Sequence, residues 1–200
     1  MNSTFGLILA GGEGSRLGGV RKADLRIGGV RLVQRVTSAF EGKVTELFLA
    51  SGQGAGSELT LPSIRDESPI PMGPLAGIRA MVRHLEGGIG HDDVLVTAAV
   101  DTPFLPQNYV ERLRQAALES GAAYAAWGDS IYPTNSAWRL TMLRDALEET
   151  SESAGPKAIL RTLGAAPVDW SADMAGDPFA NINTLADLIA LQRRATDLGI

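Results

Sequence analysis

Glycines and positively charged side chains are concentrated in one stretch near the start of the chain, residues 7–22, LILAGGEGSRLGGVRK. Glycine lets backbone N–H groups crowd around an anion without interference from Cβ atoms. Arg16, Arg21 and Lys22 add the positive charge that attracts such an anion. Because the stretch begins as an apolar, strand-like segment, it predicts a phosphate-binding loop at the end of a strand.

Two common phosphate-binding motifs do not fit this loop. The dinucleotide fingerprint G-x-G-x-x-G requires a third glycine where this chain has Leu17. The P-loop requires Lys and then Ser or Thr after its second glycine, where this chain has Val20 and Arg21. These mismatches argue against a nicotinamide or flavin enzyme and against a Walker-type kinase or GTPase.

Carboxylate and amide side chains at two other places could complete a phosphate site. Asp101 ends a strongly apolar segment, where a carboxylate is costly unless solvent or a cation meets it. Magnesium, held by one or two carboxylates and substrate phosphates, would be such a cation, although an aspartate that serves the DTP turn is the simpler alternative. Asn181 and Asn183 alternate along an extended segment, so both amides can face one site or cap the helix predicted after them.

The segments that must position these residues alternate between strand-like and helix-like patterns. This alternation is typical of an α/β sheet with helices on its faces, in which ligands bind beyond the carboxyl ends of the strands. The predicted strands are 4–10, 46–51, a short piece near 63–67, 93–101, 122–128, 131–138 and 166–170, and the predicted helices are 30–40, 73–85, 106–120, 140–149, 157–163 and 184–198.

Composition limits the class of protein. The 200 residues fit one domain, and the absence of cysteine excludes disulfides, thiolate metal sites and thiol nucleophiles. A net charge of −5 argues against a dedicated nucleic-acid-binding protein. The apolar run at the start is too short to span a membrane and lacks a cationic leader. We therefore expect a soluble, cytoplasmic protein without nucleic-acid or membrane partners.

The loop, with LAGG followed by Arg16 and Lys22, is similar to the signature of the nucleotidyltransferase (pyrophosphorylase) superfamily. Three further segments, GPLAGI (73–78), DTPFLP (101–106) and FANINTLADL (179–188), resemble counterparts in the molybdenum cofactor guanylyltransferases. The four motifs occur in the family's order over nearly the whole chain. The resemblance implies a three-layer α/β/α, Rossmann-like nucleotidyltransferase fold with a mostly parallel mixed sheet.

The resemblance also implies the reaction and its cofactor. Members of this family transfer GMP from GTP to molybdopterin and release pyrophosphate, with Mg²⁺ as cofactor. Nucleotide binding would fall to residues 1–105 and acceptor binding to residues 106–200 of a single domain. Transient contact with molybdenum-insertion and molybdoenzyme partners is implied as well.

Particular residues take roles through the same resemblance. Arg16, Lys22 and Asp101 are implied as catalytic, Asp101 as the metal ligand, and Asn181 and Asn183 as acceptor-binding. The implied nucleotide-binding residues are Leu9, Ala10, Gly11, Gly12, Gly14, Ser15, Arg16, Lys22, Asp66, Gly73, Pro74, Leu75, Ala76, Gly77 and Asp101.

One departure from the family and two alternative functions remain at this point. Where the family often has an asparagine after the second strand, this chain has Ala50 and Ser51, so that contact with the base or ribose is lost or moved. One alternative is a nucleotidyltransferase of the same fold that uses CTP or another phosphorylated acceptor. The other is a regulatory nucleotide-binding module without catalysis, against which the joint presence of Arg16, Lys22 and Asp101 argues.

Overall fold

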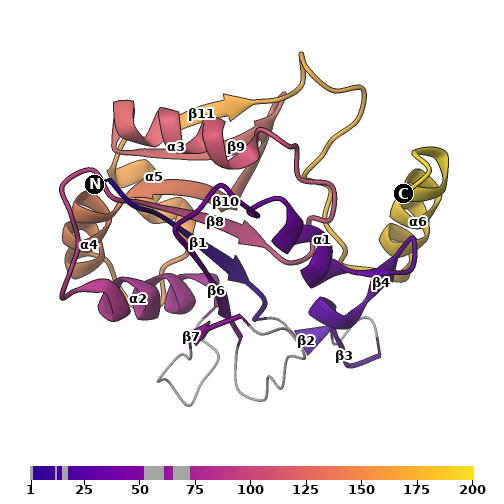
Figure 1. Cartoon of the computed structure of the whole chain (residues 1–200), viewed down its shortest axis with the longest axis horizontal. Coiled ribbons are helices and arrows are strands. Elements are labelled where there is room, and N and C mark those ends of the chain that lie inside the picture. Colours follow the sequence, from indigo (N-terminus) through magenta and orange to yellow (C-terminus); the bar gives the residue numbers. More distant parts are fainter. Residues whose placement is uncertain (1, 12, 15–17, 52–60, 65–72) are drawn as a thin grey trace.

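The computed structural model describes residues 2–11, 13–14, 18–51, 61–64 and 73–200. A seven-stranded sheet in the order β11-β9-β10-β8-β1-β6-β7 forms its centre (Figure 1). Strand β10 runs antiparallel to both of its neighbours, β8 and β9, and the other pairs are parallel. The prediction of a mostly parallel mixed sheet is confirmed. The strands are β1 Thr4–Leu9, β6 Glu46–Ala50, β7 Ser63–Ile64, β8 Val94–Ala99, β9 Ala122–Trp127, β10 Ser130–Arg139 and β11 Ala166–Asp169.

Helices cover both faces of this sheet. One hydrophobic cluster joins the sheet to α1 (Leu32–Ser38), α3 (Tyr109–Ser120) and α6 (Leu185–Asp197). A second cluster on the other face joins it to α2 (Pro74–Leu85), α4 (Leu140–Glu149) and α5 (Pro156–Thr162). These two clusters give the predicted three layers. Helix α6, which ends the chain, lies at the side of the molecule away from the N-terminus (Figure 1).

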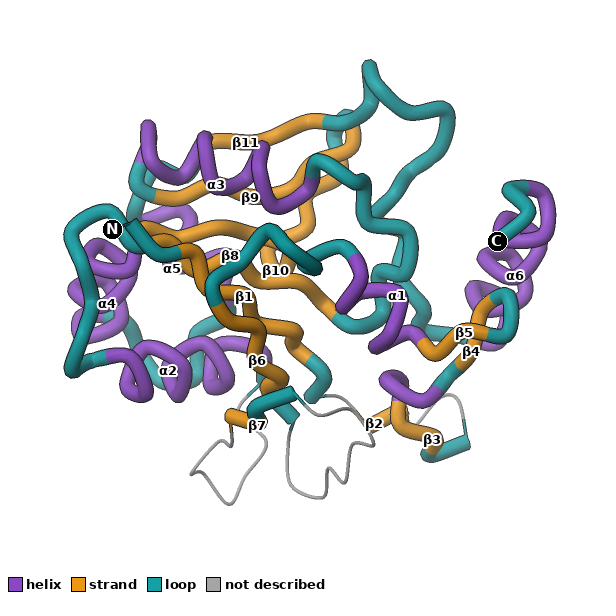
Figure 2. Tube along the Cα trace, in the orientation of Figure 1, coloured by secondary structure: helices purple, strands orange, loops and turns teal. Residues whose placement is uncertain are grey.

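Two short hairpins between β1 and α1 were not predicted (Figure 2). Strand β2 (Glu13–Gly14) pairs with β3 (Val20–Arg21), and β4 (Arg26–Ile27) pairs with β5 (Val30–Arg31). The β4–β5 turn has positive φ at both central glycines, +57° and +77°, as a two-residue hairpin turn requires. The 3₁₀ helix Lys22–Asp24 lies between the hairpins. The glycine-rich loop is therefore partly ordered by its own pairing.

The ends of the helices follow local sequence signals. Gly73 precedes α2 with φ +75°, and Pro74 occupies the first helical position, where a missing N–H costs nothing. Thr184 and Asp187 form a reciprocal capping box at the start of α6. Helix α1 begins two residues later than predicted, because residues 30–31 pair in β5.

Within the described part of the chain, none of the helices combines the length and the apolar character that crossing a bilayer would require. The cytoplasmic location and the division of the domain near residue 105 stay predictions.

Candidate active site

Three of the predicted site residues meet in one contact. The Lys22 ammonium nitrogen lies 2.6 Å from Asp101 Oδ2 and donates a second hydrogen bond to Asn183 Oδ1 at 2.9 Å. The side chains of Lys22 and Asp101 are 16% and 15% exposed, so water screens this ion pair only in part. Residues that lie 79 and 161 positions apart along the chain thus form one cluster.

The sheet and its connections place this cluster. Asp101 comes two residues after β8, and the Val100 N–H bonds to the Leu9 carbonyl, which ties the ends of β8 and β1 together. The Ile182 N–H donates to the Asp101 carbonyl at 3.2 Å and so holds the segment that carries Asn183 against the same turn. The cluster therefore lies at the carboxyl ends of the central strands, where ligands bind in open α/β sheets.

The capping box of α6 fixes the position of Asn183. The Asp187 carboxylate accepts hydrogen bonds from the backbone N–H groups of Asn183 and Thr184. These bonds, led by the one from Asn183, hold the pKa of Asp187 below its usual value. Because the carboxylate satisfies the N–H of Asn183, the neighbouring side-chain amide is presented from a helix start of defined geometry.

The cluster has the ligand chemistry of a hard-cation site. Asp101 Oδ2 and Asn183 Oδ1 both approach one cationic nitrogen, so a carboxylate and an amide oxygen already converge on a positive charge. Mg²⁺ prefers such oxygen ligands. Among the described residues, no three His, Cys, Asp or Glu side chains lie close enough to hold a metal ion by themselves. The predicted role of Asp101 as a metal ligand stays a prediction.

Several of the predicted nucleotide-binding residues at the end of β1 and after it use their backbone groups within the fold. The Leu9 carbonyl accepts from Val100, and the Ala10 N–H donates to the Ala50 carbonyl at 2.9 Å. Gly11 is exposed beyond them. Gly14 pairs with Val20 in the first hairpin. Gly12, Ser15, Arg16 and Asp66, which the sequence also assigns to nucleotide binding, lie outside the described residues.

The first turn of α2 packs closely against the sheet. Leu75 is 1% exposed and Ala76 is 8% exposed, so their side chains belong to the core and only their backbone could touch a ligand. A Cβ atom at Gly77 would lie 2.8 Å from the Cβ of Ala50 on β6, closer than such atoms pack. The small residue at position 50 thus accommodates the helix. The nucleotide-binding roles of residues 73–77 stay predictions.

The residue after Ala50 turns toward the sheet edge. The Ser51 hydroxyl lies 3.0 Å from the Ser63 hydroxyl on β7, and Ser51 is 8% exposed. Ser51 therefore bonds to a neighbouring strand at the position where the family's asparagine would stand.

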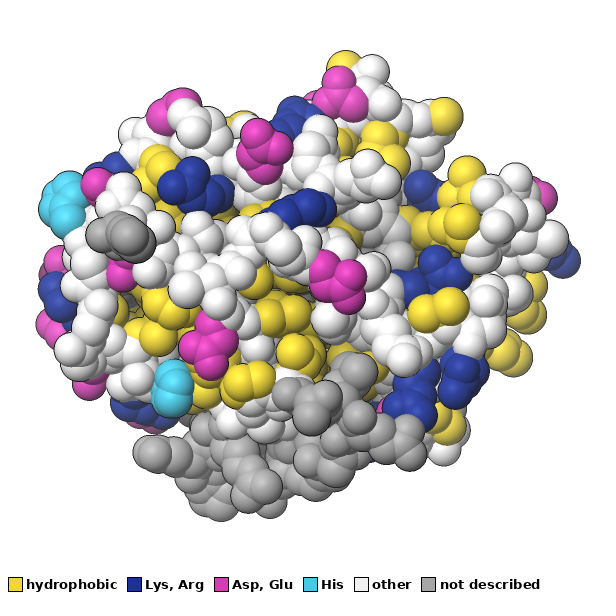
Figure 3. All heavy atoms as spheres, viewed as in Figure 1, with side chains coloured by type: hydrophobic (Ala, Val, Ile, Leu, Met, Phe, Trp, Pro, Cys, Tyr) yellow, Lys and Arg dark blue, Asp and Glu magenta, His cyan; other side chains and the backbone are white. Residues whose placement is uncertain are grey.

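Several of the other cations in this part of the chain have structural partners. Lysine and arginine side chains gather over the β3–β5 segment (Figure 3). Arg26 donates to the Gly29 carbonyl within its hairpin, and Arg35 donates to the Ile27 carbonyl and lies 5.8 Å from the Phe104 ring centre. Both side chains are therefore held by backbone carbonyls of the β4–β5 hairpin. Lys22, by contrast, faces Asp101.

Asn135 is a buried polar residue in the segment YPTNSAW, which resembles a family segment that faces the acceptor, and the sequence left open whether it serves the site or a turn. It is fully buried, and its side chain bonds to Ala99 and Thr102, on either side of Asp101. A sequence pattern offers little signal for it, because an asparagine in YPTNSAW also suits a turn.

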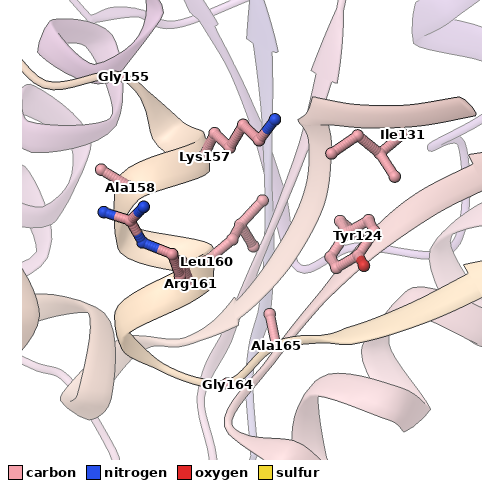
Figure 4. A pocket seen from close by; sticks show the side chains of 9 residues that line it. All are labelled: Tyr124, Ile131, Gly155, Lys157, Ala158, Leu160, Arg161, Gly164 and Ala165. Atoms are coloured by element: carbon pink, nitrogen blue, oxygen red, sulfur yellow. The ribbon is translucent and has the colours of Figure 1, made fainter.

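A separate cavity of about 710 Å³ lies between α5 and strands β9 and β10 (Figure 4). Its walls are mostly apolar. The Lys157 side chain extends from α5 toward the strands, whereas the Arg161 guanidinium points away from them (Figure 4). The lining residues include Tyr124, Ile131, Lys157, Leu160, Arg161 and Ala165. None of the predicted site residues lines this cavity, so it is separate from the site around Asp101.

Comparisons with known proteins show the family of the chain. The model of the MobA-like NTP transferase domain family matches residues 6–193. A molybdenum cofactor guanylyltransferase of Rhodobacter capsulatus is 38% identical over 192 residues, which cover 94% of this chain and 95% of that protein. Another, from Cereibacter sphaeroides, is 43% identical over 143 residues, 70% of this chain and 72% of that protein. The chain belongs to the molybdenum cofactor guanylyltransferases.

The fold agrees with this membership. The crystal structure of molybdopterin-guanine dinucleotide biosynthesis protein A from Archaeoglobus fulgidus superimposes with a TM-score of 0.76, covering 96% of this chain and 99% of that one at 21% identity. The predicted family and the nucleotidyltransferase fold are therefore confirmed. As a member of the molybdenum cofactor guanylyltransferase family, the chain is an enzyme of the nucleotidyltransferase class.

Proposed function

We propose that this guanylyltransferase transfers GMP from GTP to molybdopterin, releases pyrophosphate, and uses Lys22, Asp101 and Asn183 at its reacting centre. Family membership supports the guanylyl transfer. The single structural observation that carries the assignment of residues is the three-way contact of Lys22 with Asp101 and Asn183 at the carboxyl end of β8. That contact unites one residue each from three of the four sequence motifs.

The reaction joins two anions, so the side chains at the centre must neutralise negative charge. A terminal phosphate oxygen of the acceptor forms a bond to the α-phosphorus of GTP, while the bond from that phosphorus to the pyrophosphate oxygen breaks. Negative charge then accumulates on the departing pyrophosphate. Fixed cations and N–H donors lower the barrier most when they face the place where this charge develops.

In this proposal Lys22 supplies such a cation. Its ammonium group has three donors and sits at the end of a flexible chain, so it can bind phosphate oxygens of the triphosphate. Arg16 and the glycine loop at Gly11, Gly12, Gly14 and Ser15 would serve the same phosphates. The start of α2 at Gly73 would provide further N–H groups, since helix N-termini favour anions.

Asp101 and Asn183 would hold magnesium together with the phosphates. Their oxygens have the required chemistry and already converge on one positive charge. The bound metal ion would neutralise phosphate charge and orient the triphosphate. Asn183, with Asn181 two residues before it, would at the same time face the phosphate of molybdopterin.

The proposed setting of the enzyme follows from these substrates. We place it in the cytoplasm, with GTP and molybdopterin as its small-molecule partners. Transient contacts with the proteins that insert molybdenum and with molybdoenzymes would deliver and receive the cofactor.

Pyrophosphate release tests the proposal directly. The enzyme is supplied in turn with each of the four nucleoside triphosphates and Mg²⁺, with and without molybdopterin. We expect release only when GTP and molybdopterin are both present, and we expect Asp101→Asn to reduce the rate by roughly a thousandfold, because lost metal binding costs several kcal/mol of barrier.

Three other outcomes would each contradict a different part of the proposed function. Faster release with CTP than with GTP would point to a cytidylyltransferase. Release with GTP and a different phosphorylated acceptor, but not with molybdopterin, would show that molybdopterin is not the acceptor. If Asp101→Asn releases pyrophosphate at the rate of the parent enzyme, Asp101 is not part of the reacting centre.

A further inference from the structure

A buried asparagine side chain replaces strand pairing at the point where β8 ends. The backbone ladder between β8 and β10 reaches Ser136 opposite Thr97 and goes no further in this direction, because β10 has an irregularity between Tyr132 and Ser136. Beyond it, the N–H of Ala99 donates to Asn135 Oδ1 at 2.9 Å. This bond also fixes the orientation of the Asn135 amide, since only the oxygen can accept from an N–H.

The residues after β8 form a turn that carries Asp101. The Thr102 N–H donates to the Ala99 carbonyl at 3.3 Å, which closes a four-residue turn with Val100 and Asp101 as its central residues. The Thr102 hydroxyl donates to the same carbonyl at 2.8 Å. Both ends of the turn are therefore joined to each other.

Asn135 binds both ends of this turn at once. Its oxygen accepts from Ala99, and its Nδ2 donates to the Thr102 hydroxyl at 3.2 Å. Asn135 is 0% exposed and Thr102 is 2% exposed, so water cannot replace either bond without opening the core. A buried network whose members satisfy each other rigidifies the segment that it contacts.

We propose that Asn135, acting through Thr102, is a positioning residue that sets the place of the Asp101 carboxylate for metal and phosphate binding. This inference rests on the proposed role of Asp101. Asn135 does not touch the reacting groups in this scheme. It holds the turn, and the turn presents the carboxylate, in the way that partners behind a ligand commonly orient it.

The first test replaces Asn135 by Leu, which keeps the approximate size and removes both hydrogen bonds. Thr97→Val is the matched control, because Thr97 is also fully buried. Its hydroxyl also joins β8 to β10, by hydrogen bonds to the carbonyls of Thr134 and Ser136. These bonds do not involve the turn that carries Asp101. Both variants lose buried hydrogen bonds between the same two strands. Only Asn135→Leu releases the turn.

Two measurements separate positioning from stability. Mn²⁺ titration followed by electron paramagnetic resonance, in the presence of GTP and without acceptor, reports metal affinity; steady-state assays report kcat. For Asn135→Leu we expect at least a fivefold loss of Mn²⁺ affinity and about a tenfold to hundredfold loss of kcat, because small displacements of catalytic groups have effects of this size. For Thr97→Val we expect both quantities to stay within about twofold of the parent.

A second pair of variants keeps the test decisive if Asn135→Leu does not fold. Thr102→Val removes the hydroxyl at constant shape, and Thr102→Ser retains it. We expect the loss in Thr102→Val and its recovery in Thr102→Ser. If Asn135→Leu or Thr102→Val matches Thr97→Val in Mn²⁺ affinity and kcat, the inference is wrong.

Asp101→Asn in the same assays distinguishes this failure from failure of the proposed function. Parent-like metal affinity and rate in Asp101→Asn would overturn the role of Asp101 itself, and the inference with it. A strong loss in Asp101→Asn beside parent-like behaviour of Asn135→Leu would overturn the inference alone.

Discussion

The ion pair between Lys22 and Asp101 bears on both the stability of the fold and the proposed reaction. Each side chain is about five-sixths buried, and the Lys22 nitrogen lies 2.6 Å from the Asp101 carboxylate oxygen. Burying a lone charge is costly, so each group stabilises the other in the folded protein. The same two groups are those that the proposed reaction needs for phosphate and metal. Function and stability are therefore coupled at this pair.

A double-mutant cycle measures that coupling. Lys22→Met and Asp101→Asn should each lower the free energy of unfolding, and the double variant should be more stable than the sum of the single effects predicts. We expect a coupling energy of about 1–3 kcal/mol, less than for a fully buried pair because some water reaches both side chains. Urea unfolding of the four proteins gives this number.

The exposed pair Arg144–Asp145 is the control for this cycle. Its side chains are 41% and 67% exposed, and its coupling should stay below about 1 kcal/mol. Additive effects of Lys22→Met and Asp101→Asn would show that the ion pair contributes nothing to folding.

At the scale of elements, helix α2 packs closely against the sheet through its first turn. Gly77 makes this contact possible, because a Cβ atom at position 77 would lie 2.8 Å from the Cβ of Ala50 on β6 and 3.5 Å from Cδ2 of Leu9. A larger residue at either position would push α2 outward. The GPLAG motif thus has a packing reason as well as its predicted nucleotide contact.

Gly77→Ala should therefore destabilise the protein by about 1–3 kcal/mol through overpacking, even though alanine favours helices over glycine by about 1 kcal/mol. Adding Ala50→Gly should restore most of the loss, since it removes the atom that clashes. Thermal unfolding of the single and double variants provides the measurement.

Gly87→Ala supplies the reference for this experiment. Apart from its chain neighbours, no atom of the described residues lies within 4 Å of a Cβ at Gly87, and its φ is not in the left-handed region, so the change should be neutral or slightly stabilising. Equal effects at Gly77 and Gly87 would show that the close approach to Ala50 is not what limits position 77.

Element types were largely predictable from sequence, because apolar spacing distinguishes buried strands from amphipathic helices. Helix α4 has the predicted bounds, and most other elements differ by a few residues at their ends. The hairpins were missed because two-residue strands leave little periodicity, although the Gly28–Gly29 pair is itself a hairpin signal.

The site was predictable in part for a different reason. Motifs indicated Lys22, Asp101 and Asn183 individually, yet their contact spans up to 161 residues and depends on the order of the strands. Local patterns carry no information on such distances. The sequence left the role of Asn135 open between the acceptor side and a turn, because an isolated asparagine does not show the two bonds that its side chain makes to Ala99 and Thr102.

At the scale of the whole molecule, both ends of the chain contribute to the cluster, and α6 must be anchored for Asn183 to reach it. Gly28 in the β4–β5 turn donates to the Gln192 side chain of α6 at 3.0 Å. Arg194 of α6 donates to the backbone carbonyls of Asp177 and Gly176, and its guanidinium lies 4.7 Å from the Phe104 ring centre. Phe104 follows Asp101 by three residues. The residues that anchor α6 are thus attached to the segment that carries Asp101.

Arg194→Met should lower the free energy of unfolding by about 2 kcal/mol, because it removes charge-assisted hydrogen bonds to two carbonyls and the contact with Phe104. It should also raise the KM for molybdopterin more than the KM for GTP, since Asn183 belongs to the acceptor side in the proposed function.

Arg193→Met is the matched control, because Arg193 is the neighbouring arginine of the same helix and its side chain is exposed. Its replacement should change stability by less than about 0.5 kcal/mol. Chemical unfolding and steady-state kinetics of both variants check these expectations. If Arg194→Met were as stable as Arg193→Met, α6 would be held by its apolar contacts alone; if it were destabilised but changed both KM values equally, the anchor would support the fold without orienting Asn183.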